Sequence, residues 1–157
     1  MTGWKVGYAV GPENLNEPLR AIHQFVTFAT ATPFQEAMAV ALEQAESSAY
    51  YHQLRAEYGE RRDSLDSALR SAGLKTLPVE GAYFLMADVA GLGFPDDVAF
   101  CRWLTTEIGV AALPPSSFYL DAASAPLLAR FCFAKKPETI ALAAERLSLL
   151  SDRHARR

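Results

Sequence analysis

Two short apolar segments, each carrying a single cation, constrain the fold of this chain most strongly. The first, Thr2-Gly-Trp-Lys-Val-Gly-Tyr8, places Lys5 at the start of an apolar run that continues to Val10 and stops at a Gly-Pro pair. The second, Leu128 to Ala134, holds Arg130. Both runs predict short buried strands. A charge inside such a strand needs a partner, because burying an unpaired charge costs free energy.

Each cation is therefore a candidate anion site. The glycines around Lys5 have no Cβ, so a ligand can approach closely, and an ammonium group is a compact charge suited to phosphate. The other interpretation is a strand-end lysine that extends into solvent. In the second segment, the period of two places Arg130 on one face with Leu128 and Cys132. Its planar guanidinium matches a carboxylate through two parallel hydrogen bonds, although a structural ion pair with an Asp or Glu stays open.

The rest of the chain alternates helical and extended patterns. Thr32 and Pro33, with Gln35, predict a helix start with threonine at the N-cap, and Gly73 predicts the end of a later, longer helix. Asp96 or Asp97 is expected to cap another helix. The expected helices cover residues 17–24, 32–46, 49–71, 96–108 and 137–147, and the expected strands cover 6–10, 75–79, 82–88, 110–113 and 128–134. This order predicts an α/β fold.

Composition and residue spacing exclude several classes of protein. Hydrophobic residues make up 50% of the 157 and charged residues 21%, which is typical of a globular domain, and no apolar run reaches the ~18 residues of a membrane span. The net charge of -3 gives no general attraction to nucleic acid. The three histidines are too widely spaced for a metal-ligand motif. Cys101 and Cys132 form no CxxC pair. We expect no metal, no membrane or nucleic-acid partner, and a cytoplasmic location.

Several blocks of the sequence resemble, in order, one enzyme family. They are Thr2-Gly-Trp-Lys-Val-Gly7, His23-Gln24 with Thr27-Phe28 and Thr32-Pro33, Glu80-Gly-Ala-Tyr-Phe84, Gly109 to Pro114, and Arg130 to Lys136. Together they resemble the class I/II aminotransferases of fold type I, which use pyridoxal 5'-phosphate (PLP), and most closely the kynurenine and methionine aminotransferase branch. The resemblance implies that residues 1–45 end the large cofactor-binding domain and include an interface segment. Residues 46–157 would be the small C-terminal α/β domain.

The resemblance also implies roles for individual residues. Lys5 matches a cation that contacts the cofactor phosphate, and Arg130 matches the residue that binds the α-carboxylate of the substrate. Phe28 matches an aromatic residue that reaches into the active site of the neighbouring subunit, which implies a homodimer. An ordinary core phenylalanine is the alternative for Phe28. Tyr83 and the Phe118-Tyr119 pair lie in blocks that border the pocket, but we expect their side chains in the core.

The function implied by the resemblance is transamination with PLP, in which the amino group of an aromatic or sulfur-containing amino acid passes to a 2-oxo acid. In the family, the Schiff-base lysine lies in a Ser-x-x-Lys-Thr-like segment that precedes the Thr-Gly-Trp motif. We therefore expect this chain to be a C-terminal fragment without a catalytic residue. The alternative is a non-catalytic fragment that acts only as a binding or dimerisation partner. Because the opening strand would lack its neighbours, we also expect the isolated chain to self-associate through exposed apolar surface.

Overall fold

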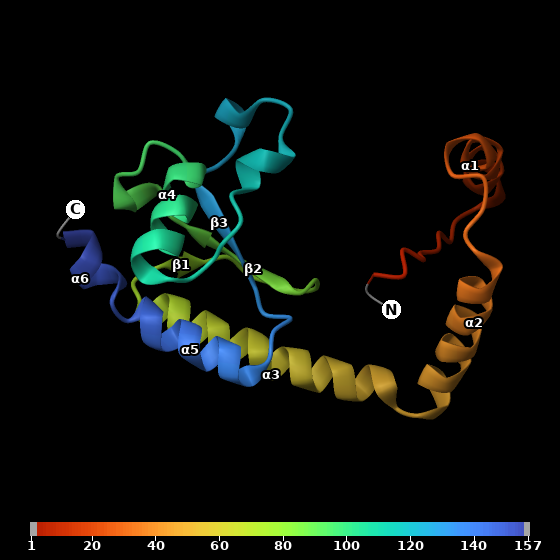
Figure 1. The fold of residues 1–157 in the computed structure, drawn as a ribbon, viewed down its shortest axis with the longest axis horizontal. Helices are drawn as coiled ribbons and strands as arrows, with labels where there is room; N and C mark the ends of the chain where they lie inside the picture. The colour runs from red at the N-terminus through yellow and green to blue at the C-terminus, as the bar shows by residue number, and fades with distance from the viewer. Residues whose placement is uncertain (1–2, 156–157) are drawn as a thin grey trace. The chain divides into compact units, whose positions relative to one another are not determined.

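The computed structural model describes residues 3–155, and the chain divides into two compact units between Gln53 and Leu54. Figure 1 labels the helices α1 to α6 and the strands β1 to β3 in chain order. Helix α3, Tyr50–Ser71, begins in the first unit and continues into the second.

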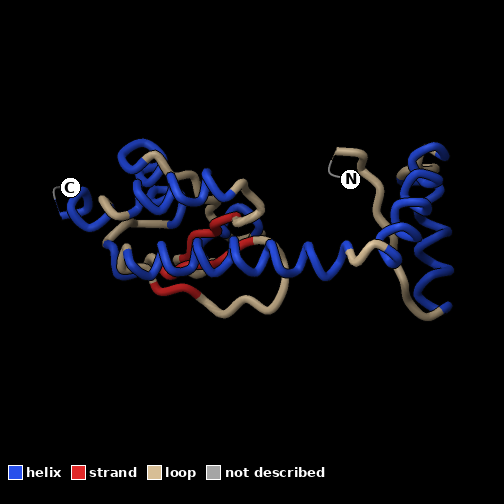
Figure 2. The backbone as a smooth tube through the Cα atoms, turned by 90° about the horizontal axis from the view of Figure 1, so that it is seen from below, coloured by secondary structure: helices blue, strands red, loops and turns tan. Residues whose placement is uncertain are grey.

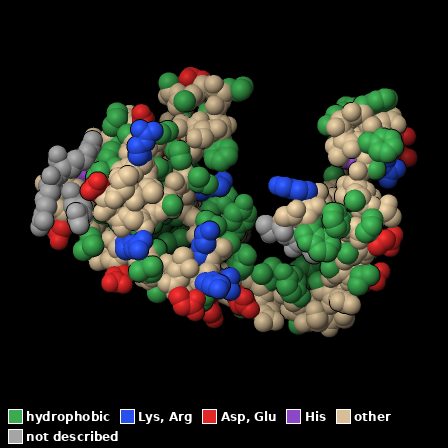
Figure 3. Space-filling model, viewed as in Figure 1, with side chains coloured by type: hydrophobic (Ala, Val, Ile, Leu, Met, Phe, Trp, Pro, Cys, Tyr) green, Lys and Arg blue, Asp and Glu red, His purple; other side chains and the backbone are tan. Residues whose placement is uncertain are grey.

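The first unit consists of irregular backbone followed by helices. Helix α1 covers Glu13–Val26 and helix α2 covers Thr32–Ser47, and no residue from 3 to 53 is buried. The apolar face of α1 is more than half exposed at Leu15, Leu19, Ile22 and Val26. Figure 3 shows hydrophobic side chains gathered on the surface of this unit. The first unit therefore has amphipathic helices without a core of its own.

The opening segment does not form the buried strand that the sequence predicts. Residues 5–10 have no regular structure, and Tyr8 and Val10 are 75% and 89% exposed. A strand persists only where a neighbour takes up its backbone hydrogen bonds. Within residues 3–155 the sheet contains β1, β2 and β3 alone, so this segment has no partner strand. The prediction of a strand at residues 6–10 is wrong for this chain.

The start of α2 also differs from the prediction. Thr32 is the first helical residue, and Ala31 occupies the N-cap position without a side-chain hydrogen bond. The side chain of Gln35 instead donates to the carbonyl oxygen of Thr30 at 2.7 Å. Proline does lie in the first turn, where its missing N–H costs no helical hydrogen bond. The start of α2 thus depends on Pro33 and Gln35, and the threonine N-cap prediction is wrong.

The second unit is built on an antiparallel sheet in the order β1-β2-β3. The strands are β1, Lys75–Thr76; β2, Phe84–Asp88; and β3, Leu128–Cys132. Among the described residues, the helical segments of five or more residues that follow or separate the strands are α4, Asp97–Trp103; its π-helical continuation η2, Leu104–Ile108; α5, Pro137–Leu147; and α6, Leu150–Ala155. The second half of α3 runs beside the strands in both backbone views (Figures 1 and 2).

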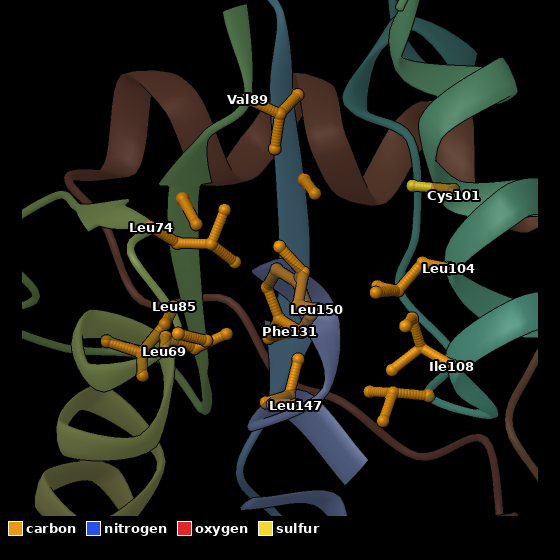
Figure 4. Packing of buried hydrophobic residues seen from close by; sticks show 14 of the residues in the cluster. Leu69, Leu74, Leu85, Val89, Cys101, Leu104, Ile108, Phe131, Leu147 and Leu150 are labelled. Atoms are coloured by element: carbon orange, nitrogen blue, oxygen red, sulfur yellow. The ribbon is translucent and has the colours of Figure 1, made fainter. Parts of the chain in front are cut away.

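One face of this sheet is buried and the other is half-exposed. Along β2 and β3 the burial alternates, with Leu85, Ala87, Ala129 and Phe131 almost inaccessible. Figure 4 shows Leu85 and Phe131 among side chains from α3, α4 with η2, and the α5–α6 region, including Leu69, Leu104, Leu147 and Leu150. The alternation predicted for the segment that contains Arg130 is therefore confirmed. All helices of the core cluster cover the same face, and Arg130 lies on the other.

Several predicted helix ends and strands are confirmed, and one strand is corrected. Gly73 and Gly109 have φ values of 85° and 77°, the left-handed conformation expected after a helix. Asp96, and not Asp97, is the N-cap of α4, where its Oδ1 accepts from the backbone N–H of Ala99 at 2.6 Å. The strand predicted at residues 110–113 is reduced to an isolated bridge between Leu113 and Arg130. The two prolines that follow Leu113 limit this pairing, because proline has no N–H to donate.

Candidate functional site

Arg130 lies in the middle of β3, on the face of the sheet that the core leaves open. Its Cα is paired with Met86 of β2 on one side, and on the other side its backbone exchanges two hydrogen bonds with Leu113, of 2.9 and 3.0 Å. The residue is thus fixed by backbone pairing on both edges of the strand. Only its side chain is free to serve a ligand.

Two aromatic rings surround the guanidinium of Arg130. Its Cζ lies 4.8 Å from the ring centroid of Phe84 and 5.2 Å from that of Phe118. Each such cation–π contact contributes about 0.5–2 kcal/mol. An aromatic face attracts the positive charge, but it does not take up the in-plane N–H donors as a carboxylate would. The rings therefore restrict the guanidinium and leave its hydrogen-bonding capacity unused.

Within the described part of the chain, Arg130 has no acidic partner. No Asp or Glu among residues 3–155 forms an ion pair with it, and its buried Nε donates no hydrogen bond there. A buried donor without an acceptor is costly and uncommon in folded proteins. The structural ion pair with an Asp or Glu, which the sequence analysis left open, is not formed among residues 3–155. The arrangement instead fits a planar anion such as a carboxylate.

The loop that carries Phe118 is attached to α4 by a buried carboxylate. Phe118 ends the 3-10 turn η3, Pro115–Phe118. Asp97 is 2% exposed and accepts two hydrogen bonds from Ser116, one from its backbone N–H at 2.8 Å and one from its hydroxyl at 2.6 Å.

Burial, together with the negative charge of Asp97, raises the pKa of the Cys101 thiol to about 12. Cys101 is therefore a protonated core residue and not a nucleophile.

Lys5 lies in the first unit, on exposed irregular backbone. Its φ of 56° is in the left-handed region, which costs a non-glycine residue about 1–2 kcal/mol. No ion pair to Lys5 is formed among residues 3–155. An added Cβ at Gly3 or Gly7 would meet no atom within 4 Å, so the backbone around the lysine is open to a ligand. An unpaired ammonium beside open backbone fits the phosphate group of a cofactor.

Phe28 and the other aromatic residues named from the sequence are exposed. Phe28 has a φ of 71° and its side chain is 83% exposed, so it is not a core phenylalanine of the first unit. Tyr83, Phe118 and Tyr119 are 50%, 67% and 47% exposed. The expectation that these three lie in the core is wrong. Tyr83 and Tyr119 lie outside the helices and strands, and Phe118 ends the turn η3.

The predicted site residues belong to different units of the chain. Lys5 and Phe28 belong to the first unit, and Arg130 belongs to the second. The structure shows that Phe84 contacts Arg130 and that Asp97 and Ser116 fix the turn that carries Phe118. The sequence analysis assigned none of these three residues to the site. The consecutive Asp96 and Asp97 at a helix start could have given a signal, since one cap needs only one of them.

Metal-ligand clusters and membrane helices are not found in the described residues. Between residues 3 and 155, no group of three His, Cys, Asp or Glu side chains is placed to hold a metal ion. No helix in that range combines the length and apolar character needed to cross a membrane.

Comparison with known proteins gives a consistent result. The family described as "Aminotransferase class I and II" matches residues 1–147. Methionine aminotransferase of Escherichia coli K12 is 47% identical over 150 residues, which cover 96% of this chain and 38% of that protein. Kynurenine–oxoglutarate transaminase of Dictyostelium discoideum is 38% identical over 137 residues, covering 77% of this chain and 32% of that protein.

Solved structures of aminotransferases share the fold. The structure of the E. coli methionine aminotransferase superposes with a TM-score of 0.82 at 46% identity and covers 96% of this chain and 38% of that one. N-succinyldiaminopimelate aminotransferase from Mycobacterium tuberculosis gives a TM-score of 0.80 at 39% identity, covering 95% of this chain and 38% of that one. The chain thus spans less than two fifths of the length of these relatives.

Proposed function

Because the chain belongs to the class I and II aminotransferase family, we propose that it is the C-terminal portion of a PLP-dependent transaminase. The enzyme would transfer the amino group of an aromatic or sulfur-containing amino acid to a 2-oxo acid. Two of its relatives are a methionine aminotransferase and a kynurenine–oxoglutarate transaminase, which supports donors of these two kinds. The proposed location is the cytoplasm.

The observation that carries the proposal is that Arg130 is held by aromatic rings but has no anionic partner among residues 3–155. Its guanidinium is held by Phe84 and Phe118, its Nε is buried, and no carboxylate of residues 3–155 neutralises it. An amino acid and a 2-oxo acid share one group that matches this arrangement, the α-carboxylate. We assign to Arg130 the binding of that carboxylate through two in-plane hydrogen bonds.

In this proposal the chain binds and orients the substrate. Two bonds between the guanidinium and the carboxylate fix both the position and the rotation of the substrate, and the rings prevent the guanidinium from turning with it. Fixing the carboxylate also limits the positions that the α-carbon and its amino group can take. The same carboxylate is present before and after amino transfer, so Arg130 serves both half-reactions.

Lys5 is the proposed contact for the phosphate of PLP. Its unpaired ammonium and the open backbone of Gly3 and Gly7 support this role. When bound, PLP supplies the electron sink that stabilises negative charge at the substrate α-carbon. By the family resemblance, the lysine that binds PLP covalently precedes the Thr-Gly-Trp motif. We therefore assign no proton transfer to any residue of this chain.

The whole enzyme is proposed to be a homodimer, in which Phe28 lines the active site of the neighbouring subunit. The 83% exposure of Phe28 supports a contact outside its own unit. We propose 1–45 and 46–157 as the limits of the two domains in the whole protein. The compact units of this chain divide a few residues later, between Gln53 and Leu54, inside helix α3.

A second candidate function is that of a non-catalytic binding or dimerisation partner. The exposed apolar face of α1, with Leu19 and Ile22 more than half accessible, supports it. In this case the chain would bind another protein through its first unit and would have no use for Arg130. The two candidate functions therefore differ in whether a substitution of Arg130 would impair the function.

A chimeric enzyme tests the proposed function. Residues 1–157 replace the matched C-terminal part of E. coli methionine aminotransferase, with which they share 47% identity. We expect the purified chimera to bind PLP and to transaminate methionine or an aromatic amino acid with a 2-oxo acid acceptor. The unmodified E. coli enzyme is the positive control. A folded chimera that binds PLP but transfers no amino group from any of these donors would contradict the proposal and favour the binding partner.

A further inference from the structure

The burial and hydrogen bonds of Asp97 are not explained by its position at the start of a helix. An aspartate in the first turn of a helix is usually exposed and stabilises free backbone N–H groups. Here Asp96 performs the capping, through its bond to Ala99 of 2.6 Å, whereas Asp97 is 2% exposed. Both carboxylate oxygens of Asp97 are directed to Ser116, a residue 19 positions later in the chain. Two neighbouring aspartates thus have separate roles.

The bonds from Asp97 hold the turn η3 at its centre. Before the turn, the backbone is fixed where Leu113 pairs with Arg130. Within the turn, Ser116 is fixed by both its N–H and its hydroxyl. Two residues later, the ring of Phe118 lies 5.2 Å from the guanidinium carbon of Arg130. The segment from Leu113 to Phe118 is therefore attached at two points on either side of the prolines.

Burial in the core cannot fix Phe118, because its side chain is 67% exposed. A ring in that situation is placed mainly by the backbone that carries it. The backbone of η3 is placed by Asp97, whose buried charge tolerates few other arrangements, since an unpaired carboxylate in the interior is strongly disfavoured. The hydrogen bonds of Asp97 to Ser116 thus constrain the turn that carries Phe118, and the ring of Phe118 contacts Arg130.

We propose that Asp97 and Ser116 are positioning residues, which hold Phe118 against Arg130 and so set the orientation of the guanidinium. The pair deepens the proposed function, and its effect on substrate binding rests on that function. Neither residue touches the substrate. Their contribution is to keep the in-plane donors of Arg130 directed to one place, so that the carboxylate finds them already aligned.

The geometric part is tested on the full 157-residue chain with 15N-labelled arginine. The Nε–Hε resonance of Arg130, identified by its loss in Arg130→Lys, senses the nearby rings. Phe118→Leu shows how far it moves when one ring is removed. We expect Asp97→Asn to move it in the same direction, because asparagine lacks the charge that strengthens both bonds, and its amide nitrogen can keep a bond to Ser116 only if the hydroxyl turns to accept it. Ser116→Ala should act alike, and Ser116→Thr should restore the wild-type position.

Asp96→Asn is the matched control. It makes the same chemical change at the neighbouring residue, and asparagine is also a good N-cap, so the Arg130 resonance should stay in place. The methyl resonances of Leu104 and Leu147 report whether the core is intact in each variant. If Asp97→Asn does not fold, the positioning role is tested with Ser116→Ala instead, because this variant removes only one hydroxyl. Intact variants of Asp97 and Ser116 with the wild-type Arg130 resonance would overturn the proposal.

The functional part uses the chimera described above. We expect Asp97→Asn to raise KM for the amino acid about tenfold and to change kcat by less than about twofold, as for a loss of substrate alignment. Asp96→Asn should leave both unchanged. A moved Arg130 resonance with KM insensitive to every Arg130 substitution would refute the proposed function alone. A KM that depends on Arg130 but not on Asp97, with an unmoved resonance, would refute the positioning role alone.

Discussion

At the scale of single residues, several charged side chains are paired within the protein, whereas Arg130 has no acidic partner among residues 3–155. Arg61 pairs with Glu57, and Arg70 with Asp66, each one helical turn apart on α3. Ion pairs one turn apart on a helix surface contribute about 0.3–0.5 kcal/mol each. Asp97 is used entirely inside the protein. Among residues 3–155, Arg130 combines a buried donor with the lack of any acidic partner, which is the basis for its proposed role in binding a carboxylate.

The two cysteines allow a residue-scale prediction. Burial and the charge of Asp97 raise the pKa of Cys101 to about 12, against an ordinary 9.0, so at about pH 8 its thiolate fraction is about 1000-fold smaller than that of an ordinary thiol. Cys132 is only partly buried. We expect Ellman's reagent to modify Cys132 first and to modify Cys101 only as the chain unfolds.

The variants Cys132→Ala and Cys101→Ala separate the two reactions. In Cys132→Ala the single remaining thiol should react slowly and accelerate with urea. In Cys101→Ala the remaining thiol should react readily without urea. Similar rates for both variants in the native state would show that Cys101 is accessible, contrary to the packing of α4.

At the scale of elements, helix α5 shows how a helix is divided between core and surface. Leu147, at its end, is completely buried in the core cluster, whereas Leu142, on the same helix, is 47% exposed. Both positions carry the same side chain in the same secondary structure. The difference in their contribution to stability therefore comes from packing and not from helix propensity.

We expect Leu147→Ala to lower the free energy of unfolding by about 2–5 kcal/mol, because it removes buried apolar area and leaves a cavity. Leu142→Ala should change it by less than about 1 kcal/mol, since the side chain is already half in water. Urea denaturation of both variants measures the difference. Equal effects would mean that α5 does not pack on the sheet through Leu147.

Most elements of the second unit could be predicted from the sequence. The alternation around Arg130, the glycines at the helix ends and the aspartate before α4 each depend on neighbours within a few residues. The prediction of a strand at residues 6–10 was wrong because a strand needs a neighbouring strand to pair with, and the local sequence does not show whether one is present. The contacts of Arg130 with Phe84 and Phe118, and of Asp97 with Ser116, join distant positions. Nothing in the local spacing of these residues predicts them.

At the scale of the whole molecule, the two units differ in what stabilises them. Every residue of the core cluster lies between Leu65 and Leu150, in the second unit. The first unit has no buried residue from 3 to 53 and exposes the apolar face of α1. An exposed apolar face on a helix favours association with another protein surface.

The isolated chain is therefore expected to self-associate at micromolar concentration. Introducing charge on the exposed face of α1, with Leu19→Glu and Ile22→Glu, should shift it towards the monomer. Leu142→Glu, at an exposed leucine of the second unit, is the matched control and should leave the association unchanged. Light scattering during size-exclusion chromatography measures the mass. A monomeric wild-type chain would contradict this expectation.

The most direct test of the proposed role of Arg130 is how strongly the chimera prefers an amino acid to its carboxamide. The two donors differ only in whether they carry the α-carboxylate, the group that Arg130 is proposed to bind, or a neutral carboxamide. We predict that the chimera prefers methionine to methioninamide by at least about 100-fold in kcat/KM, and that Arg130→Gln removes most of this preference, because the charged, bidentate contact is lost. If the preference survives in Arg130→Gln, the α-carboxylate is bound elsewhere and Arg130 does not have the proposed role.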